Sequence, residues 1–211
     1  MNVSRQIGWS NESNLLYQIL KQLNKLAGVL SSLVNNSTPK YKVYTALLTQ
    51  SGGDDVLTVN SGNLTIGVTY FINDTQVGMD FTNVGAPNND VGTYFVATGT
   101  TPNSWGIDVG AGVLNYNTAA PTVTVLENTI GNIWFTYNNV GVYTIKSNSL
   151  FTTNKTTFFM GIMDNNVGQP IIGTDHFAND ESTYQFIITD QSGGFQNEFL
   201  YNSPIEIRVY N

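Results

Sequence analysis

Residues 10–35 read SNESNLLYQILKQLNKLAGVLSSLVN, and this stretch decides how the chain is organised. Large apolar residues recur in it at alternating spacings of three and four, the pattern of a helix with one apolar seam. The seam residues are Leu16, Ile19, Leu23, Leu26, Leu30 and Leu33. Ser10 or Asn11 can cap the helix, and Glu12 lies in the first turn, where a negative charge is favourable. The spacing therefore predicts a helix over residues 10–35.

The positions that flank the seam are mostly apolar as well. They are Leu15, Leu20, Gln22, Ala27, Val29 and Val34. A two-stranded coiled coil places charged residues there, so the pattern favours a trimer or higher bundle, or a helix seated in a socket on a partner protein. An amphipathic helix lying on the chain's own β-domain is the remaining alternative. A helix of this length is marginal in water by itself and needs such support.

The chain changes character after the helix. Pro39 follows a polar break and ends any helical continuation. Arg5, Lys21, Lys25 and Lys40 outnumber Glu12 on the N-terminal side, whereas Lys and Arg are absent from position 43 to position 145. We therefore expect a stem and attachment segment over 1–38 and a separate body over 39–211.

The body has the alternation and turn chemistry of β-strands. Strands are expected at 41–49, 56–60, 64–72, 92–98, 121–127, 132–137, 140–146, 156–163, 184–190 and 204–210. Many short strands without an intervening helical pattern are typical of an antiparallel β-sandwich or jelly roll. The predicted fold is therefore mainly β, with an N-terminal helical, coiled-coil stem.

The composition excludes several classes of protein. The formal net charge is -7, and no basic surface is available to neutralise the phosphates of a nucleic acid. The absence of cysteine excludes a disulfide scaffold, a thiol nucleophile and a cysteine-based zinc site. No stretch approaches the ~20 apolar residues of a membrane span. The first nine residues hold no apolar run long enough for a signal peptide, so we expect synthesis in a cytoplasm without secretion.

Catalytic and metal-binding patterns are weak. His176 is the one histidine, and its neighbour Asp175 points to the opposite face of an extended segment, so we expect a plain loop histidine. Asp164 to Gly168 resembles the start of a calcium loop, but the glycine comes one place early and the closing glutamate is missing. We expect no enzyme activity, no catalytic residue, no metal site and no cofactor.

Three segments resemble those of bacteriophage structural proteins. The sequence SRQIGWSNESNLL at 4–16 resembles the start of many such proteins, including those of phages that infect Bacteroidetes-type hosts. The sequences KVYTALLTQSG at 42–52 and VTVLENTIG at 123–131 are similar to a β-module that recurs in phage fibre-like proteins. These two segments run almost directly together in shorter relatives, so the resemblance implies that residues 53–118 are an inserted β-module.

The resemblance implies a virion protein made in the host bacterium, either a head fibre or spike or a tail-associated receptor-binding protein. Its expected partners are further copies of the chain, as a homotrimer, and capsid or tail proteins. Arg5, Ile7 and Trp9 are then candidates for attachment to the particle; Trp9 could equally be a hydrophobic staple on the helix. A capsid-decoration subunit is the first rival. A polysaccharide hydrolase is the second, but the chain is short for one and shows no recurring carboxylate pair.

A receptor-binding body stacks sugars on exposed aromatic rings and hydrogen-bonds them with amide side chains. Trp105 lies in a turn-rich stretch where exposure is plausible, and Tyr94 and Tyr116 are near it in the sequence. These three residues are the candidate contacts to a host-surface glycan. The alternative for Trp105 is that its ring closes the core of the inserted module.

Overall fold

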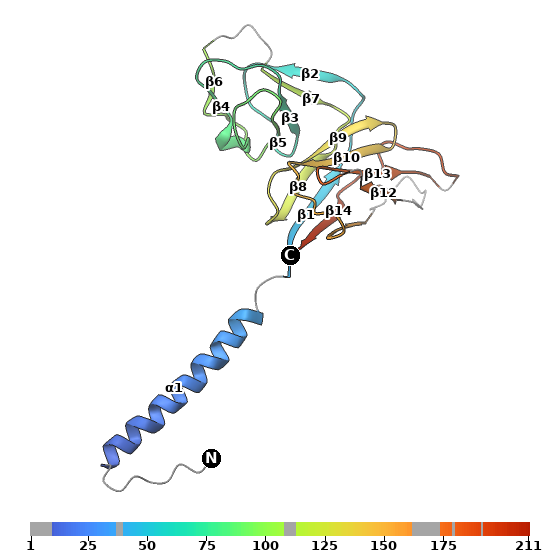
Figure 1. Ribbon diagram of the computed structural model, residues 1–211. Coiled ribbons are helices and arrows are strands. Elements are labelled where there is room, and N and C mark those ends of the chain that lie inside the picture. Colours follow the sequence, from blue (N-terminus) through green and yellow to red (C-terminus); the bar gives the residue numbers. More distant parts are fainter. Residues whose placement is uncertain (1–9, 37–39, 108–112, 162–173, 179, 191) are drawn as a thin grey trace. The chain divides into compact units, whose positions relative to one another are not determined.

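The structure is a computed structural model, and it describes residues 10–36, 40–107, 113–161, 174–178, 180–190 and 192–211. The chain divides into two compact units, residues 1–40 and residues 41–211 (Figure 1). The first unit contains one helix, and the second is built from antiparallel strands. The fold is therefore mainly β with an N-terminal helix, as the sequence predicts.

The helix α1 spans Asn11–Asn36 and confirms the helix expected at 10–35. Ser10 caps it, because its carbonyl accepts a hydrogen bond from the Asn14 amide (3.1 Å) and its hydroxyl accepts one from the Ser13 amide (3.3 Å). The side-chain bond satisfies one of the amides that the first turn leaves without a partner. Glu12 lies in this first turn.

Strands fill most of the second unit. Their bounds are β1 Tyr41–Thr49, β2 Val56–Val59, β3 Thr69–Ile72, β4 Met79–Asp80, β5 Tyr94–Val96, β6 Ser104–Trp105, β7 Leu114–Asn117, β8 Thr122–Asn128, β9 Ile133–Asn139, β10 Val142–Ser147, β11 Thr156–Met160, β12 Thr174–Ala178, β13 Thr183–Ile188 and β14 Ser203–Tyr210. A short 3-10 helix, η1, spans Thr82–Val84.

Two four-stranded sheets share one hydrophobic core. The first has the strand order β11-β14-β1-β8 and the second β12-β13-β10-β9. Tyr44, Leu48 and Ile207 of the first sheet and Phe135 and Tyr143 of the second are almost completely buried in this core. Alternation explains the burial, because every second residue of a strand points to the same face. Tyr44, Ala46 and Leu48 of β1 are buried, and the residues between them are half-buried.

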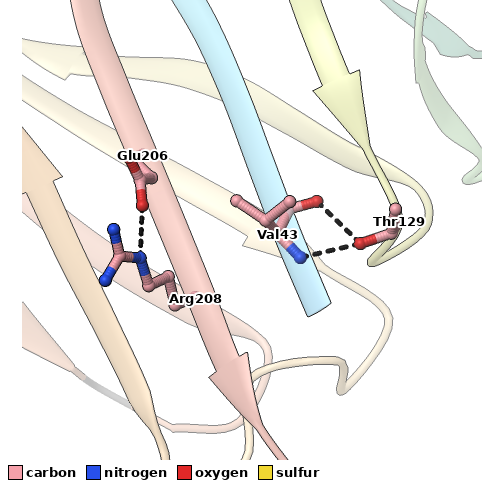
Figure 2. A network of polar contacts seen from close by, with 4 residues as sticks. All are labelled: Val43, Thr129, Glu206 and Arg208. Atoms are coloured by element: carbon pink, nitrogen blue, oxygen red, sulfur yellow. Dashed lines mark hydrogen bonds and ion pairs between the residues drawn. The ribbon is translucent and has the colours of Figure 1, made fainter. Parts of the chain in front are cut away.

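The start of β1 is fixed by a side chain from the segment that follows β8. The Val43 amide donates to the Thr129 hydroxyl (2.7 Å), and that hydroxyl donates back to the Val43 carbonyl (3.1 Å). Figure 2 shows this pair beside Arg208 and Glu206 of β14, which form an ion pair. The Arg208 guanidinium also lies over the rings of Tyr41 and Phe159.

Residues 56–117 build two smaller sheets and a core of their own. The strand orders are β2-β7-β3-β5 and β4-β6. Ile72, Phe81, Phe95 and Leu114 are fully buried in this second core. Strands β1 and β8, which lie on either side of this stretch in the sequence, pair directly with each other in the first large sheet.

Some expected strands are shorter in the structure. Only Thr69–Ile72 of the stretch 64–72 is a strand, because Gly67 adopts a left-handed conformation with a φ of 85° that extended chain does not use. Strands β4, β6, β7 and β12 were not expected. His176 lies in β12, paired with Phe186 of β13, so its expected position in a loop is wrong.

Candidate functional site

The helix α1 presents a broad apolar face. Heptad positions a and d are occupied by Leu16, Ile19, Leu23, Leu26 and Leu30, whose side chains are 47% to 65% exposed. Leu15, Leu20 and Val29, at the flanking e and g positions, are 48% to 63% exposed. Every described side chain of α1, over residues 11–32, is exposed. Leu33 belongs to the helix, but its side chain lies outside the described part, as does that of Val34.

The opposite face of α1 is polar. Lys21 and Asn24 lie at outer heptad positions, together with Lys25 and Ser32. The six e and g positions carry no charged residue. A helix with apolar residues at a, d, e and g, and polar residues elsewhere, has a wider apolar face than the a/d seam of a two-stranded coil.

The N-terminal residues predicted to attach to a particle lie outside the described residues. These are Arg5, Ile7 and Trp9. Within the part of the chain that is described, no helix is both long and apolar enough to cross a membrane.

The body has an open cleft of about 230 Å³ where the small sheet meets β9. Strands β3 and β5 contact β9 at this junction. The cleft is lined by Val56, Thr69, Phe71, Tyr94, Asn115, Tyr116, Asn117, Ala120, Phe135, Thr136 and Tyr137. None of these residues is charged.

The register of the small sheet explains which side chains share the cleft face. Asn115 of β7 pairs with Phe71 of β3, and Phe71 pairs with Tyr94 of β5, so the three lie in one row across the sheet. Cross-strand partners point to the same face of a sheet. This row therefore forms one wall of the cleft. The facing wall comes from Thr136 and its neighbours on β9.

The two walls are joined by specific contacts. The rings of Tyr94 and Trp134 stack in parallel, with centroids 5.6 Å apart. The Asn132 side-chain amide donates to the Tyr94 carbonyl (2.9 Å). The Phe135 amide donates to the Thr69 hydroxyl (3.4 Å). These contacts give the cleft a fixed shape, which a binding site needs.

Two polar side chains in the cleft have unused hydrogen-bonding capacity. The Thr136 hydroxyl is buried and has no hydrogen-bond partner among the described residues. A buried hydroxyl without a partner costs ~1–3 kcal/mol, so its presence calls for an explanation. The Asn115 side-chain oxygen accepts a hydrogen bond from Thr58 (2.9 Å), and its NH₂ group makes no bond that the structure records. The Thr136 oxygen is covered by the protein, so it is not accessible to a ligand in the cleft.

The three predicted glycan contacts lie in different environments. Tyr94 lines the cleft, and burial raises the pKa of its hydroxyl above the usual value of 10.0. Tyr116 borders the cleft, but its ring packs on Tyr70 in the second core (centroids 5.4 Å apart). Trp105 is not among the residues that line the cleft: its ring packs edge-on against Phe81, and its indole NH donates to the Gly62 carbonyl (3.0 Å).

Other sequence features form no site in the described residues. No group of three or more His, Asp and Glu side chains that could hold a metal ion occurs there. The calcium-like stretch from Asp164 to Gly168 lies outside the described residues.

No family model matches the chain, and no curated protein or solved structure is significantly similar to it. The helix face is therefore the feature from which a function is inferred.

Proposed function

We propose that the protein is a non-enzymatic structural subunit of a bacteriophage particle, an oligomeric head fibre or spike. Its N-terminal segment attaches to the particle, and α1 assembles a coiled-coil stem. The body, a β-sandwich with the small sheets as an inserted module, is displayed for host attachment. The observation that carries this proposal is the exposed apolar face of α1 in heptad register.

The apolar face favours association strongly. Burying a Leu or Ile side chain contributes ~1.5–3 kcal/mol, so five seam residues contribute on the order of 10 kcal/mol per chain. Part of this offsets the entropy that the chains lose on association. Large apolar patches on proteins are normally interaction sites, and the continuous apolar face of α1 is such a patch.

The residues at the helix interface favour three chains over two. Leu16, Leu23 and Leu30 occupy the a positions, and Ile19, Leu26 and Leu33 occupy d. The first heptad therefore has the combination of Leu at a with Ile at d that shifts coiled coils from dimers toward trimers and tetramers, and the other two have Leu at both positions. Apolar e and g positions act in the same direction, because they become buried when more than two helices surround one axis.

The breadth of the apolar face of α1 also favours a second candidate function. A capsid-decoration subunit would insert α1 into an apolar socket on another virion protein and would not assemble by itself. The two candidates predict different masses for the purified protein in solution. A self-assembling stem predicts three times the mass of one chain, and a decoration subunit predicts the mass of a single chain.

The proposal is tested by substitutions on the two faces of the helix. The double variant Leu23→Ser and Leu26→Ser removes two central seam residues, and we expect it to sediment as a monomer at concentrations where the parent is oligomeric. The matched control is Lys21→Ser with Lys25→Ser, on the polar face, which should keep the parent's mass. A seam variant that keeps the parent's oligomeric mass would exclude a coiled-coil stem.

A further inference from the structure

The first large sheet carries apolar residues on both of its faces. Tyr44, Ala46 and Leu48 of β1 point into the core, so the residues between them lie on the opposite face, the outer face of this sheet. Strands β1, β14 and β11 pair in register, and their outward residues therefore share one surface. Its apolar members are Tyr41, Val43, Leu47, Phe159, Pro204 and Tyr210. An antiparallel sheet with one face in water normally alternates apolar and polar residues, so this sequence is typical of a sheet that is covered on both sides.

The outer face of the first sheet also holds a cluster of aromatic rings around one arginine. The Arg208 guanidinium lies 4.8 Å from the ring centroid of Tyr41 and 5.1 Å from that of Phe159. Aromatic residues and arginine are the residues that protein interfaces favour most. Arg208 forms an ion pair with Glu206 (Figure 2), so the cluster brings no net charge to a contact. Glu127 of β8, at the edge of the sheet, lies at the rim of this face.

The covalent chain indicates what covers this face. Helix α1 ends at Asn36 and β1 begins at Tyr41, so the chain between their Cα atoms spans at most ~18 Å. Helices that pack together have axes only ~8–10 Å apart. Assembly of the stem therefore tethers the first sheets of all copies to one another, at an effective concentration in the millimolar range.

We propose that the outer faces of the first sheets pack against one another in the oligomer, so that the body adds a second interface between copies of the chain. This proposal rests on the stem proposed above and extends the assembly from the helix to the body. The contact is weak by itself, because most side chains of β1 and β14 on this face are already half-buried against their neighbours and have little surface left to bury. Isolated bodies at micromolar concentration therefore stay apart, and the tether brings the faces together.

The test uses single cysteines, because the chain has none of its own. Thr157→Cys places a thiol on the outer face, opposite Arg208, and Gln185→Cys places one on the outer side of the second sheet. Each is measured in the otherwise unchanged chain and in the Leu23→Ser and Leu26→Ser background, so that every site is its own reference. A bulky maleimide should react with Thr157→Cys about tenfold more slowly in the oligomer, where the contact covers the site most of the time.

The second cysteine is the control for this protection. Gln185→Cys should react at the same rate in the oligomer and in the dissociated chain. Equal rates for Thr157→Cys in the two backgrounds overturn the body contact. Equal slowing of both sites in the oligomer also overturns it, because the protection would then not be specific to the outer face of the first sheet.

A substitution on the same face tests whether the contact contributes to assembly. The Phe159 side chain is 51% exposed, and Phe159→Ala should raise about fivefold the concentration below which the oligomer dissociates. Leu57→Ala, on β2 of the small sheet, is the matched control, because Leu57 is similarly exposed (44%), and it should dissociate as the parent does. Sedimentation over a dilution series measures both. Equal effects of the two substitutions would contradict the proposal.

Light scattering on the intact chain separates this proposal from that of the stem. A monomer would defeat the stem and the body contact together. An oligomer in which Thr157→Cys stays fully reactive would leave the stem standing and overturn the body contact alone.

Discussion

At the scale of single residues, short polar side chains fix the turns of the body. Asp190 illustrates this. One of its carboxylate oxygens accepts hydrogen bonds from the Ser192 hydroxyl (2.7 Å) and from the Ser192 and Gly194 amides (2.9 Å each). The other accepts one from the Gln196 side chain (2.9 Å). Ser192 contributes most to lowering the pKa of Asp190 from 3.8 to about 2.

This shift predicts how the turn responds to acid. Because the pKa of Asp190 is lower in the folded state, ionised Asp190 stabilises the fold above the usual pKa of 3.8. That stabilisation is lost as the pH falls toward about 2. A carbon-detected NMR titration should give a midpoint near 2 for Asp190, and Ser192→Ala should raise it. A midpoint at the usual value in the folded parent would contradict the hydrogen-bonded turn.

The hydrogen bonds of the Thr129 hydroxyl lead to a second prediction at the scale of single residues. This hydroxyl both accepts from and donates to the backbone of Val43 (Figure 2). Thr129→Val should lower the free energy of unfolding by ~1–3 kcal/mol, because it leaves the Val43 amide without its partner. The Val43 carbonyl keeps the hydrogen bond from the Thr129 amide (2.8 Å). Chemical denaturation measures this change. Thr124→Val, on the exposed part of β8, is the control and should change stability by less than ~0.5 kcal/mol. Equal effects would mean that the Thr129 bonds contribute nothing.

Single residues also show how far the sequence reaches. Tyr94 is a candidate glycan contact from the sequence; it lines the cleft, and its role as a ligand contact stays a prediction. That Phe71, Asn115 and Thr136 line the same cleft could not be predicted, because only the folded chain brings their three strands together. The alternation of β9 held one signal: Thr136 shares the face of Trp134, opposite the buried Phe135. That the same hydroxyl lacks a partner is visible only in three dimensions.

At the scale of elements, helix and strand patterns differ in how far they can be predicted. The helix follows from a repeat sustained over nearly three heptads. Strands β1 and β14 follow from their β-branched and aromatic residues. Their pairing, which runs from Tyr41 with Tyr210 to Leu48 with Ser203, is visible only in the structure. Strand β7, with the sequence LNYN, is poor in β-branched residues and forms because β2 and β3 pair with it on both sides.

Gly67 lies where the small sheets meet β8, and substituting it should lower the free energy of unfolding. Gly67 has a φ of 85°, and its carbonyl accepts a hydrogen bond from the Val123 amide (2.8 Å). A Cβ at Gly67 would lie 2.5 Å from the Val123 carbonyl oxygen, whereas one at Gly78, with a φ of 79°, would meet open space. Gly78→Ala should cost ~1–2 kcal/mol of unfolding free energy from backbone strain alone.

Gly67→Ala adds a steric clash to the same strain. It should cost ~1–3 kcal/mol more than Gly78→Ala, because the backbone of β8 must move away. Thermal unfolding of both variants gives the difference. Similar losses for the two variants would show that the close approach of Gly67 to Val123 is absent in solution.

At the scale of the whole molecule, the division into two units predicts that the body stays folded without the helix. Both hydrophobic cores lie within residues 41–211, so deletion of residues 1–38 should leave a folded body. Circular dichroism of the truncated chain should lose the helical signal and keep the β signal. Its unfolding transition in dilute solution should remain cooperative. A body that unfolds on truncation would mean that the stem segment is part of its core.

The most direct test of the stem is the mass of the protein in solution. We would measure the intact chain and the 39–211 fragment by light scattering during gel filtration. The proposal predicts three times the chain mass for the intact protein and a single chain for the fragment, because the fragment lacks the apolar face of α1. An intact chain that elutes as a monomer at all concentrations would contradict the self-assembling stem.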